Sequence, residues 1–158
     1  MTSQRSVSLF GLPVAPGGLV SVPVRYRKVL PIQHVGLVSD RVGPDGQPMI
    51  LHNSPRFGGV VETSASEFCV GAMGRLCWHG PLPKSRPLPE VLDAARAEIG
   101  AEYDGLKNNC EHYVTRVSTG QAESPQVTAN IAAGGFISGI LGSICGAVVV
   151  AVIRTLGN

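Results

Sequence analysis

The stretch around Cys110 holds residue types that could do covalent chemistry. Asn108 and Asn109 precede the cysteine, and Gly120 follows ten residues later. Either asparagine suits an N-cap and the glycine suits a helix stop, so the pattern predicts a helix that begins at the thiol. The free N–H groups and dipole of a helix start favour an anion, so we expect a lowered pKa for Cys110 and a nucleophilic thiol. The alternative is a buried structural cysteine.

A thiol nucleophile also needs a base, and a third group to hold that base. His34 and His52 lie in two runs with strand character, residues 31–39 and 47–53. Turn residues around Gly43 join these runs, which predicts a hairpin. Folding about Gly43 sets the two histidines opposite each other on one face of the hairpin. The alternative for either histidine is a purely structural role.

His112 is a different case, because it lies two residues after Cys110. Residues i and i+2 of a helix face different directions, so we expect His112 to support the helix and not to serve as the base. A zinc site built from Cys110, His112 and the strand histidines is an alternative, but the ligand spacing typical of such sites is absent. We expect neither a metal nor a cofactor.

The elements that must position these residues alternate between strand and helix patterns. Apolar residues recur at helical spacing from Pro89 to Ile99, and Gly100 is a suitable stop. Residues 66–71 are expected to continue a strand or form a short loop. The predicted strands are residues 19–24, 31–39, 47–53, 58–63 and 75–78. Together with the Cys110 helix, this pattern predicts an α+β fold in which a small antiparallel sheet packs on the helix that bears the cysteine.

Length and charge limit the number of domains and the kinds of partner. The chain has 158 residues and a net charge of +2, with 15% charged residues. This length suits one folded domain. Basic patches with interleaved aromatic residues are absent, so we expect no nucleic-acid partner. Residues 1–15 are predicted to be an irregular lead-in, followed by the folded domain at 16–128.

The last segment, residues 129–158, differs in kind. Residues 131–153 carry no charge. This uncharged run is long enough for a helix to cross a bilayer. Small residues recur there at every fourth position, which allows transmembrane helices to pack closely and would support a homo-oligomer. We therefore expect a single-pass C-terminal membrane anchor. The alternative is an Ala/Gly-rich helix buried in the domain, or a flexible tail.

The run from Asn109 to Val114 resembles the Asn-Cys-Glu-His-Phe motif of the lecithin retinol acyltransferase (LRAT) family. That family and the related small phospholipase/acyltransferases are a permuted branch of the NlpC-type papain-like thiol hydrolases. The resemblance extends over residues 16–127, and several family members also end in a hydrophobic anchor. It includes the segments around the two strand histidines, His34-Val35-Gly36-Leu37-Val38 and Ile50-Leu51-His52.

The resemblance implies that Cys110 is the nucleophile, His34 the general base and His52 the residue that orients the base. Asn109, Glu111 and His112 are then supporting members of the motif. Three features depart from the family pattern. The two histidines are 18 residues apart, Val35 replaces an aromatic residue, and Tyr113 replaces phenylalanine.

The function implied is acyl transfer through a cysteine thioester, with phospholipid or another acyl ester as substrate. Water as acceptor would make the protein a phospholipase A-type hydrolase, and an amine or alcohol would make it an acyltransferase. We expect the protein at a membrane, with the catalytic domain in the cytoplasm. One alternative is a cysteine amidase or peptidase of the NlpC-type superfamily. The other is a membrane-interacting module without enzymatic activity.

Overall fold

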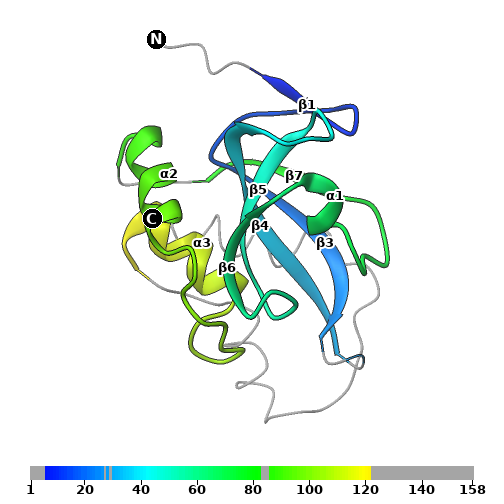
Figure 1. Cartoon of the computed structure of the whole chain (residues 1–158), viewed down its shortest axis with the longest axis vertical. Helices are drawn as coiled ribbons and strands as arrows, with labels where there is room; N and C mark the ends of the chain where they lie inside the picture. The colour runs from blue at the N-terminus through cyan, green and yellow to red at the C-terminus, as the bar shows by residue number, and fades with distance from the viewer. Residues whose placement is uncertain (1–5, 27, 29, 83–85, 122–158) are drawn as a thin grey trace.

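Five antiparallel strands form the central sheet of this α+β protein, with spatial order β6-β5-β4-β3-β7. The computed structural model describes residues 6–26, 28, 30–82 and 86–121. A separate hairpin, β1-β2, lies beside one end of the sheet (Figure 1). The elements are β1 Val7–Leu9, β2 Leu12–Val14, β3 Gly18–Tyr26, β4 Leu30–Val42, β5 Pro48–Ser54, β6 Gly59–Thr63, α1 Ala65–Phe68, β7 Cys77–Pro81, α2 Leu88–Ala97 and α3 Cys110–Thr119.

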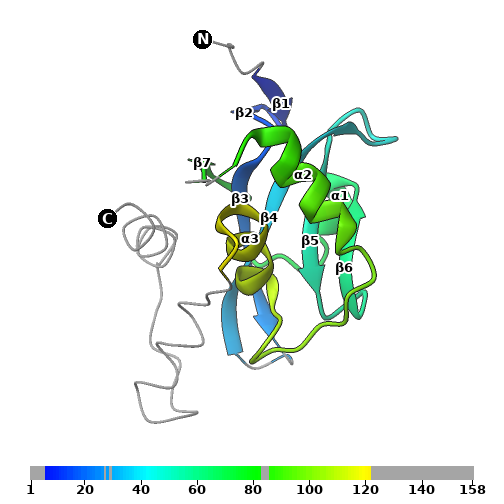
Figure 2. The same cartoon turned by 90° about the vertical axis from the view of Figure 1, so that its left-hand side faces the viewer.

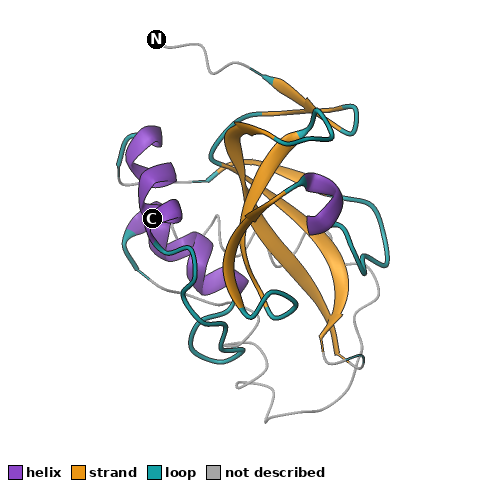
Figure 3. Ribbon diagram, in the orientation of Figure 1, coloured by secondary structure: helices purple, strands orange, loops and turns teal. Residues whose placement is uncertain are grey.

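Helices cover the sheet on opposite faces. Helices α2 and α3 lie together against one face, and the short helix α1 lies against the other (Figures 2 and 3). Strand residues alternate between the faces, so the sheet contributes to two hydrophobic cores. The first core joins Val35, Leu37 and Leu51 to α2 and α3. The second joins Val38 and Ile50 to α1 and the β1-β2 hairpin.

The turn between β4 and β5 follows the predicted chemistry. Asp45 Oδ1 accepts the Gln47 N–H at 3.1 Å, and Gly46 adopts a left-handed conformation with φ of 73°. Both features are typical of tight turns, where an aspartate closes the loop and glycine tolerates positive φ. The hairpin that carries both strand histidines is therefore confirmed.

Three local predictions were wrong. The lead-in at 1–15 was expected to be irregular, but it contains the β1-β2 hairpin. Residues 66–71 are not a strand, because Ser64 and Glu67 form a capping box that starts α1. The helix predicted to run to Ile99 ends at Ala97, and Ile99 lies beyond it and is exposed.

The predicted membrane anchor at 131–153 lies outside the described residues, as does the boundary at 128–129. Within the part of the chain that the structure describes, none of the helices is long and apolar enough to cross a bilayer.

Candidate active site

Helix α3 begins at the thiol, as the sequence predicted. Asn109 is the N-cap, and its Oδ1 accepts the N–H groups of Glu111 and His112, both at 3.0 Å. The His112 ring returns the bond, because its Nδ1 accepts the Asn109 N–H at 3.4 Å. Gly120 ends the helix with φ of 84°. His112 therefore closes a capping box, which matches the supporting role expected for it.

The Cys110 thiol is buried against strand β4, with 3% of the residue exposed. Its Sγ donates to the Gln33 carbonyl oxygen at 3.9 Å, and the Val35 N–H faces the sulfur. Burial raises the thiol pKa to about 12, and the Glu111 carboxylate adds to this effect. The lowered pKa predicted from the helix start was wrong. Backbone N–H groups do favour the thiolate, but the loss of solvent outweighs them.

His34 and His52 form a direct hydrogen-bonded pair. His34 Nε2 lies 2.9 Å from His52 Nδ1, and His52 Nε2 lies 2.9 Å from Thr63 Oγ1. Burial lowers the pKa of His34 to about 4. The pKa of His52 is lowered well below its ordinary value by burial, by His34 and by Arg56. Both imidazoles are therefore neutral at pH 7, and a neutral imidazole can accept a proton.

The predicted register of this hairpin was displaced. Folding about Gly43 would pair Leu37 with Met49, whereas Leu37 pairs with Leu51. The turn is centred on Asp45 and not on Gly43, because Val42 pairs with Pro48 and the Gly43 N–H donates to the Gln47 carbonyl. An irregularity between Val38 and Val42 then reduces the displacement. Because the displacement is two residues, both histidines keep the same face of the sheet.

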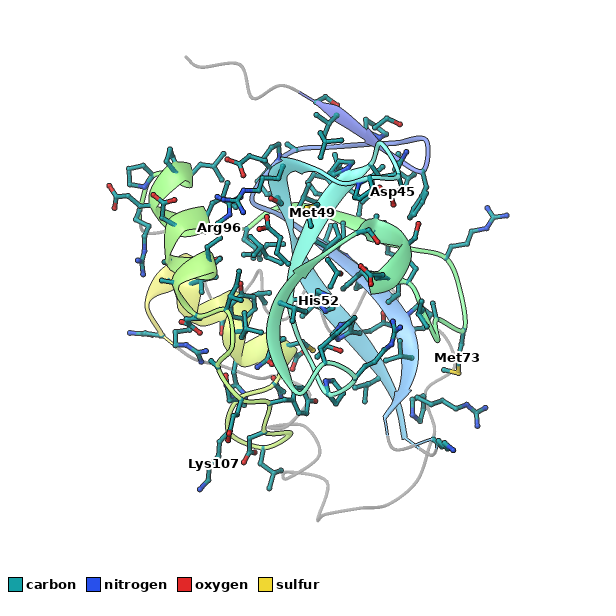
Figure 4. The ribbon with its side chains drawn as sticks, in the orientation of Figure 1. Asp45, Met49, His52, Met73, Arg96 and Lys107 are labelled. Atoms are coloured by element: carbon teal, nitrogen blue, oxygen red, sulfur yellow. The ribbon has the colours of Figure 1, made fainter. Side chains whose placement is uncertain are left out.

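Phe68 from α1 holds the two imidazoles in place. Its ring stacks on His34 at a centroid distance of 5.0 Å and meets the His52 ring edge-on at 5.0 Å. Gly36, next to His34 on the same face, makes room for it, because a Cβ there would lie 3.1 Å from the Phe68 ring. Figure 4 shows His52 on β5, in the middle of the sheet.

Cys110 and His34, the predicted nucleophile and base, lie on opposite faces of the sheet. Cys110 packs with the α2-α3 core, whereas the His34 ring lies against Phe68 in the α1 core. The Cys110 thiol contacts the backbone of β4 on either side of His34, at the Gln33 carbonyl and the Val35 N–H. Among the described residues, hydrogen bonds link His34 to His52 and Cys110 to Gln33, but none joins Cys110 to His34.

A pocket of about 520 Å³ opens on the histidine side. Both histidines line it, while Cys110 does not. Its apolar walls come from Val24, Ile32, Phe57, Phe68 and Val70, and the exposed cations Arg25 and Arg56 line it as well. This volume lies within the range of pockets that bind small molecules.

The loop before Cys110 is anchored by residues that sequence reasoning missed. Asn53 donates from Nδ2 to the Asn108 carbonyl at 2.7 Å, and Asn108 donates to the Glu102 carbonyl at 2.6 Å. Thr63 and Phe68 were missed as well. Asn53 adjoins His52 in sequence, which was an available signal. Thr63 and Phe68 carry no local signal, because only the tertiary fold brings them to the histidines.

The described residues hold no group of three metal-ligating side chains. What they hold is a cysteine at a helix start and two hydrogen-bonded histidines, which are the residue types that a thiol nucleophile and its base require. A family model described as lecithin retinol acyltransferase matches residues 52–123. The resemblance seen in the motif is thereby confirmed for residues 52–123, a stretch that includes His52 and Cys110. No curated protein matches the chain. No solved structure matches it either.

Proposed function

We propose that the protein transfers acyl groups from lipid esters through a thioester on Cys110. The observation that carries this proposal is the His34–His52 pair. Its neutral rings line a pocket, while Cys110 lies against the same strand at the start of a helix. The match to an acyltransferase family supports the same chemistry.

In the first half-reaction, His34 acts as general base and Cys110 as nucleophile. The thiol proton passes to His34 Nδ1, since Nε2 is bonded to His52. Sulfur bonds to the ester carbonyl carbon while the C=O π electrons move to oxygen. Collapse of this intermediate breaks the C–O bond, and the leaving alkoxide takes the proton from His34. Because the resting thiol is neutral, proton transfer accompanies the attack.

The second half-reaction reverses these roles with a new acceptor. His34 removes a proton from water, an alcohol or an amine, which attacks the thioester carbonyl. The Cys110 sulfur then leaves and recovers the proton. Water as acceptor gives hydrolysis of the phospholipase A type, and the other acceptors give acyl transfer. Asn109 already engages the Glu111 and His112 N–H groups, which leaves the Cys110 N–H as our candidate oxyanion donor at the helix start.

The pocket favours an acyl lipid over a peptide amide, the substrate of the alternative NlpC-type amidase. Val24, Ile32 and Val70 offer apolar contacts for an acyl chain, and Arg25 and Arg56 offer charge for an anionic headgroup. We further propose that residues 131–153 anchor the domain at a bilayer, where such esters are concentrated. Full-length protein should then remain in the membrane fraction through alkaline carbonate. Release of the protein by carbonate would contradict the proposed anchor.

Intact-mass analysis tests the chemistry directly. After brief incubation with phospholipid vesicles and an acid quench, we expect one fatty acyl addition on the wild-type chain. The matched control Cys110→Ala should show none, while Cys69→Ala should still acylate, since Cys69 is a free cysteine outside the site. Acylation that persists in Cys110→Ala would overturn the proposal. A mass addition from a peptide amide and none from phospholipid would favour the amidase.

A further inference from the structure

Thr63, the last residue of β6, is the outer partner of the histidine pair. The residue is buried, with 6% exposed, and its Oγ1 lies 2.9 Å from His52 Nε2. Its hydroxyl donates to the Ser64 carbonyl oxygen at 3.2 Å. The same carbonyl accepts the Phe68 N–H, the bond that opens α1. A carbonyl can only accept, so in the arrangement that makes both of these hydrogen bonds the single hydroxyl proton of Thr63 goes to Ser64.

The direction of that proton fixes the rest of the chain of hydrogen bonds. Towards His52, Thr63 Oγ1 can only accept, so His52 Nε2 carries the ring proton. A neutral imidazole has one N–H, which leaves His52 Nδ1 as an acceptor. His34 Nε2 must then donate to it across 2.9 Å. The lone pair of His34 is left on Nδ1.

We propose that Thr63 is a positioning residue that sets the tautomers of both histidines and keeps His34 Nδ1 free to accept a proton. Its value for catalysis rests on the proposed function, in which His34 is the base. Phe68 adds to this control, because its ring packs on both imidazoles and restricts their rotation.

Removing the Thr63 hydroxyl should move the proton of each imidazole from Nε2 to Nδ1. In Thr63→Val, which keeps the size of the side chain, His52 Nε2–H loses its acceptor. A His52 ring protonated at Nδ1 then becomes competitive, since an unpaired buried donor is costly. That tautomer presents N–H to His34 Nε2, so the His34 proton moves to Nδ1 and blocks the base. Thr63→Ser retains the hydroxyl and should retain the wild-type arrangement.

Imidazole ¹⁵N NMR on the full-length protein tests this directly, since protonated and bare ring nitrogens differ strongly in shift. The chain has four histidines, and His34→Gln and His52→Gln variants assign the two that matter. We expect Nε2-protonated rings for His34 and His52 in wild type and Thr63→Ser. In Thr63→Val we expect the Nδ1-protonated form at His52, and kcat lowered roughly tenfold or more with little change in KM.

Several results would overturn the inference. A wild-type ring protonated at Nδ1 would do so even if no variant folds. Unchanged tautomers in Thr63→Val, or an unchanged kcat despite altered tautomers, would also do so. The proposed function fails separately: if the tautomers follow Thr63 as expected but Cys110 never carries an acyl group, the hydrogen-bond assignment stands and the acyl-transfer chemistry does not.

Discussion

The Cys110 helix start and the His34–His52 pair are built in different ways. The helix start is closed by local bonds, since Asn109 and His112 cap each other one turn apart. The histidine pair is held by Thr63 and Phe68, which lie 11 and 16 residues beyond His52 in the chain. Both halves are buried, but only the histidine half lines a pocket. Burial keeps the Cys110 thiol neutral, whereas the two histidines can be reached from the pocket.

The largest losses of activity should come from replacing the predicted base or the predicted nucleophile. His34→Ala and Cys110→Ala should each lower lipid hydrolysis about 10³-fold or more, and the double variant should be no worse, because nucleophile and base act as a unit. Fatty acid release from vesicles measures this. Substantial activity in His34→Ala would mean that another group serves as base.

A smaller loss is expected at the orienting position. His52→Gln keeps an acceptor for His34 Nε2 and a donor for Thr63, so it should lose activity only about tenfold. His52→Leu offers neither bond and should lose about a hundredfold or more. Comparison of kcat for the two variants checks this. Equal losses would show that the hydrogen bonds of His52 do not matter.

Alkylation separates the two free cysteines among the described residues. If His34 draws the proton from Cys110, His34→Ala should slow iodoacetamide labelling of Cys110 about tenfold, because the buried thiol then has no base to overcome its raised pKa. Cys69 should label at the same rate in both proteins and serves as the internal control. Peptide-resolved mass spectrometry gives both rates. Equal Cys110 rates would contradict the coupling of the two halves.

The histidine half should also make stability depend on pH. The pKa of His34 falls to about 4 on folding, so the unfolded chain binds more protons below pH ~6.5. The contribution of His34 to the free energy of unfolding is therefore fully present above that pH and is lost as the pH falls towards 4. Between pH ~7.5 and ~5 we expect His34 alone to lower the free energy of unfolding by about 2 kcal/mol. Urea unfolding at several pH values measures the slope. His34→Gln should flatten it, and an unchanged slope would argue against a buried neutral His34.

The smallest expected effect concerns a hydrogen bond that holds α3 against α2. Tyr113 on α3 donates its hydroxyl to the Ala95 carbonyl of α2 at 2.9 Å. Tyr113→Phe restores the residue of the family motif but leaves that carbonyl without this donor, so we expect a loss of about 1 kcal/mol in unfolding free energy. Activity should be unchanged, since the ring still packs. Thermal unfolding and lipid hydrolysis check the two parts, and a large loss of activity would place Tyr113 closer to the chemistry.

Residues close in sequence determined one half of this site. Asn109, Cys110 and Gly120 predicted the start and end of α3, because caps depend on neighbours within a turn. The turn around Gly43 likewise predicted the hairpin that carries both histidines. The site residues and the α+β class followed from these local patterns and from the family resemblance.

Only the tertiary structure decided the other half. The register that brings His34 to His52, and the roles of Thr63 and Phe68, depend on contacts between separate elements. The thiol pKa is the sharpest case. A helix start predicts a lowered value, yet packing α3 against β4 removes solvent from Cys110, and burial is a property of the assembled fold. Local sequence determined the place of Cys110 at the start of α3, and long-range packing determined the charge of its thiol.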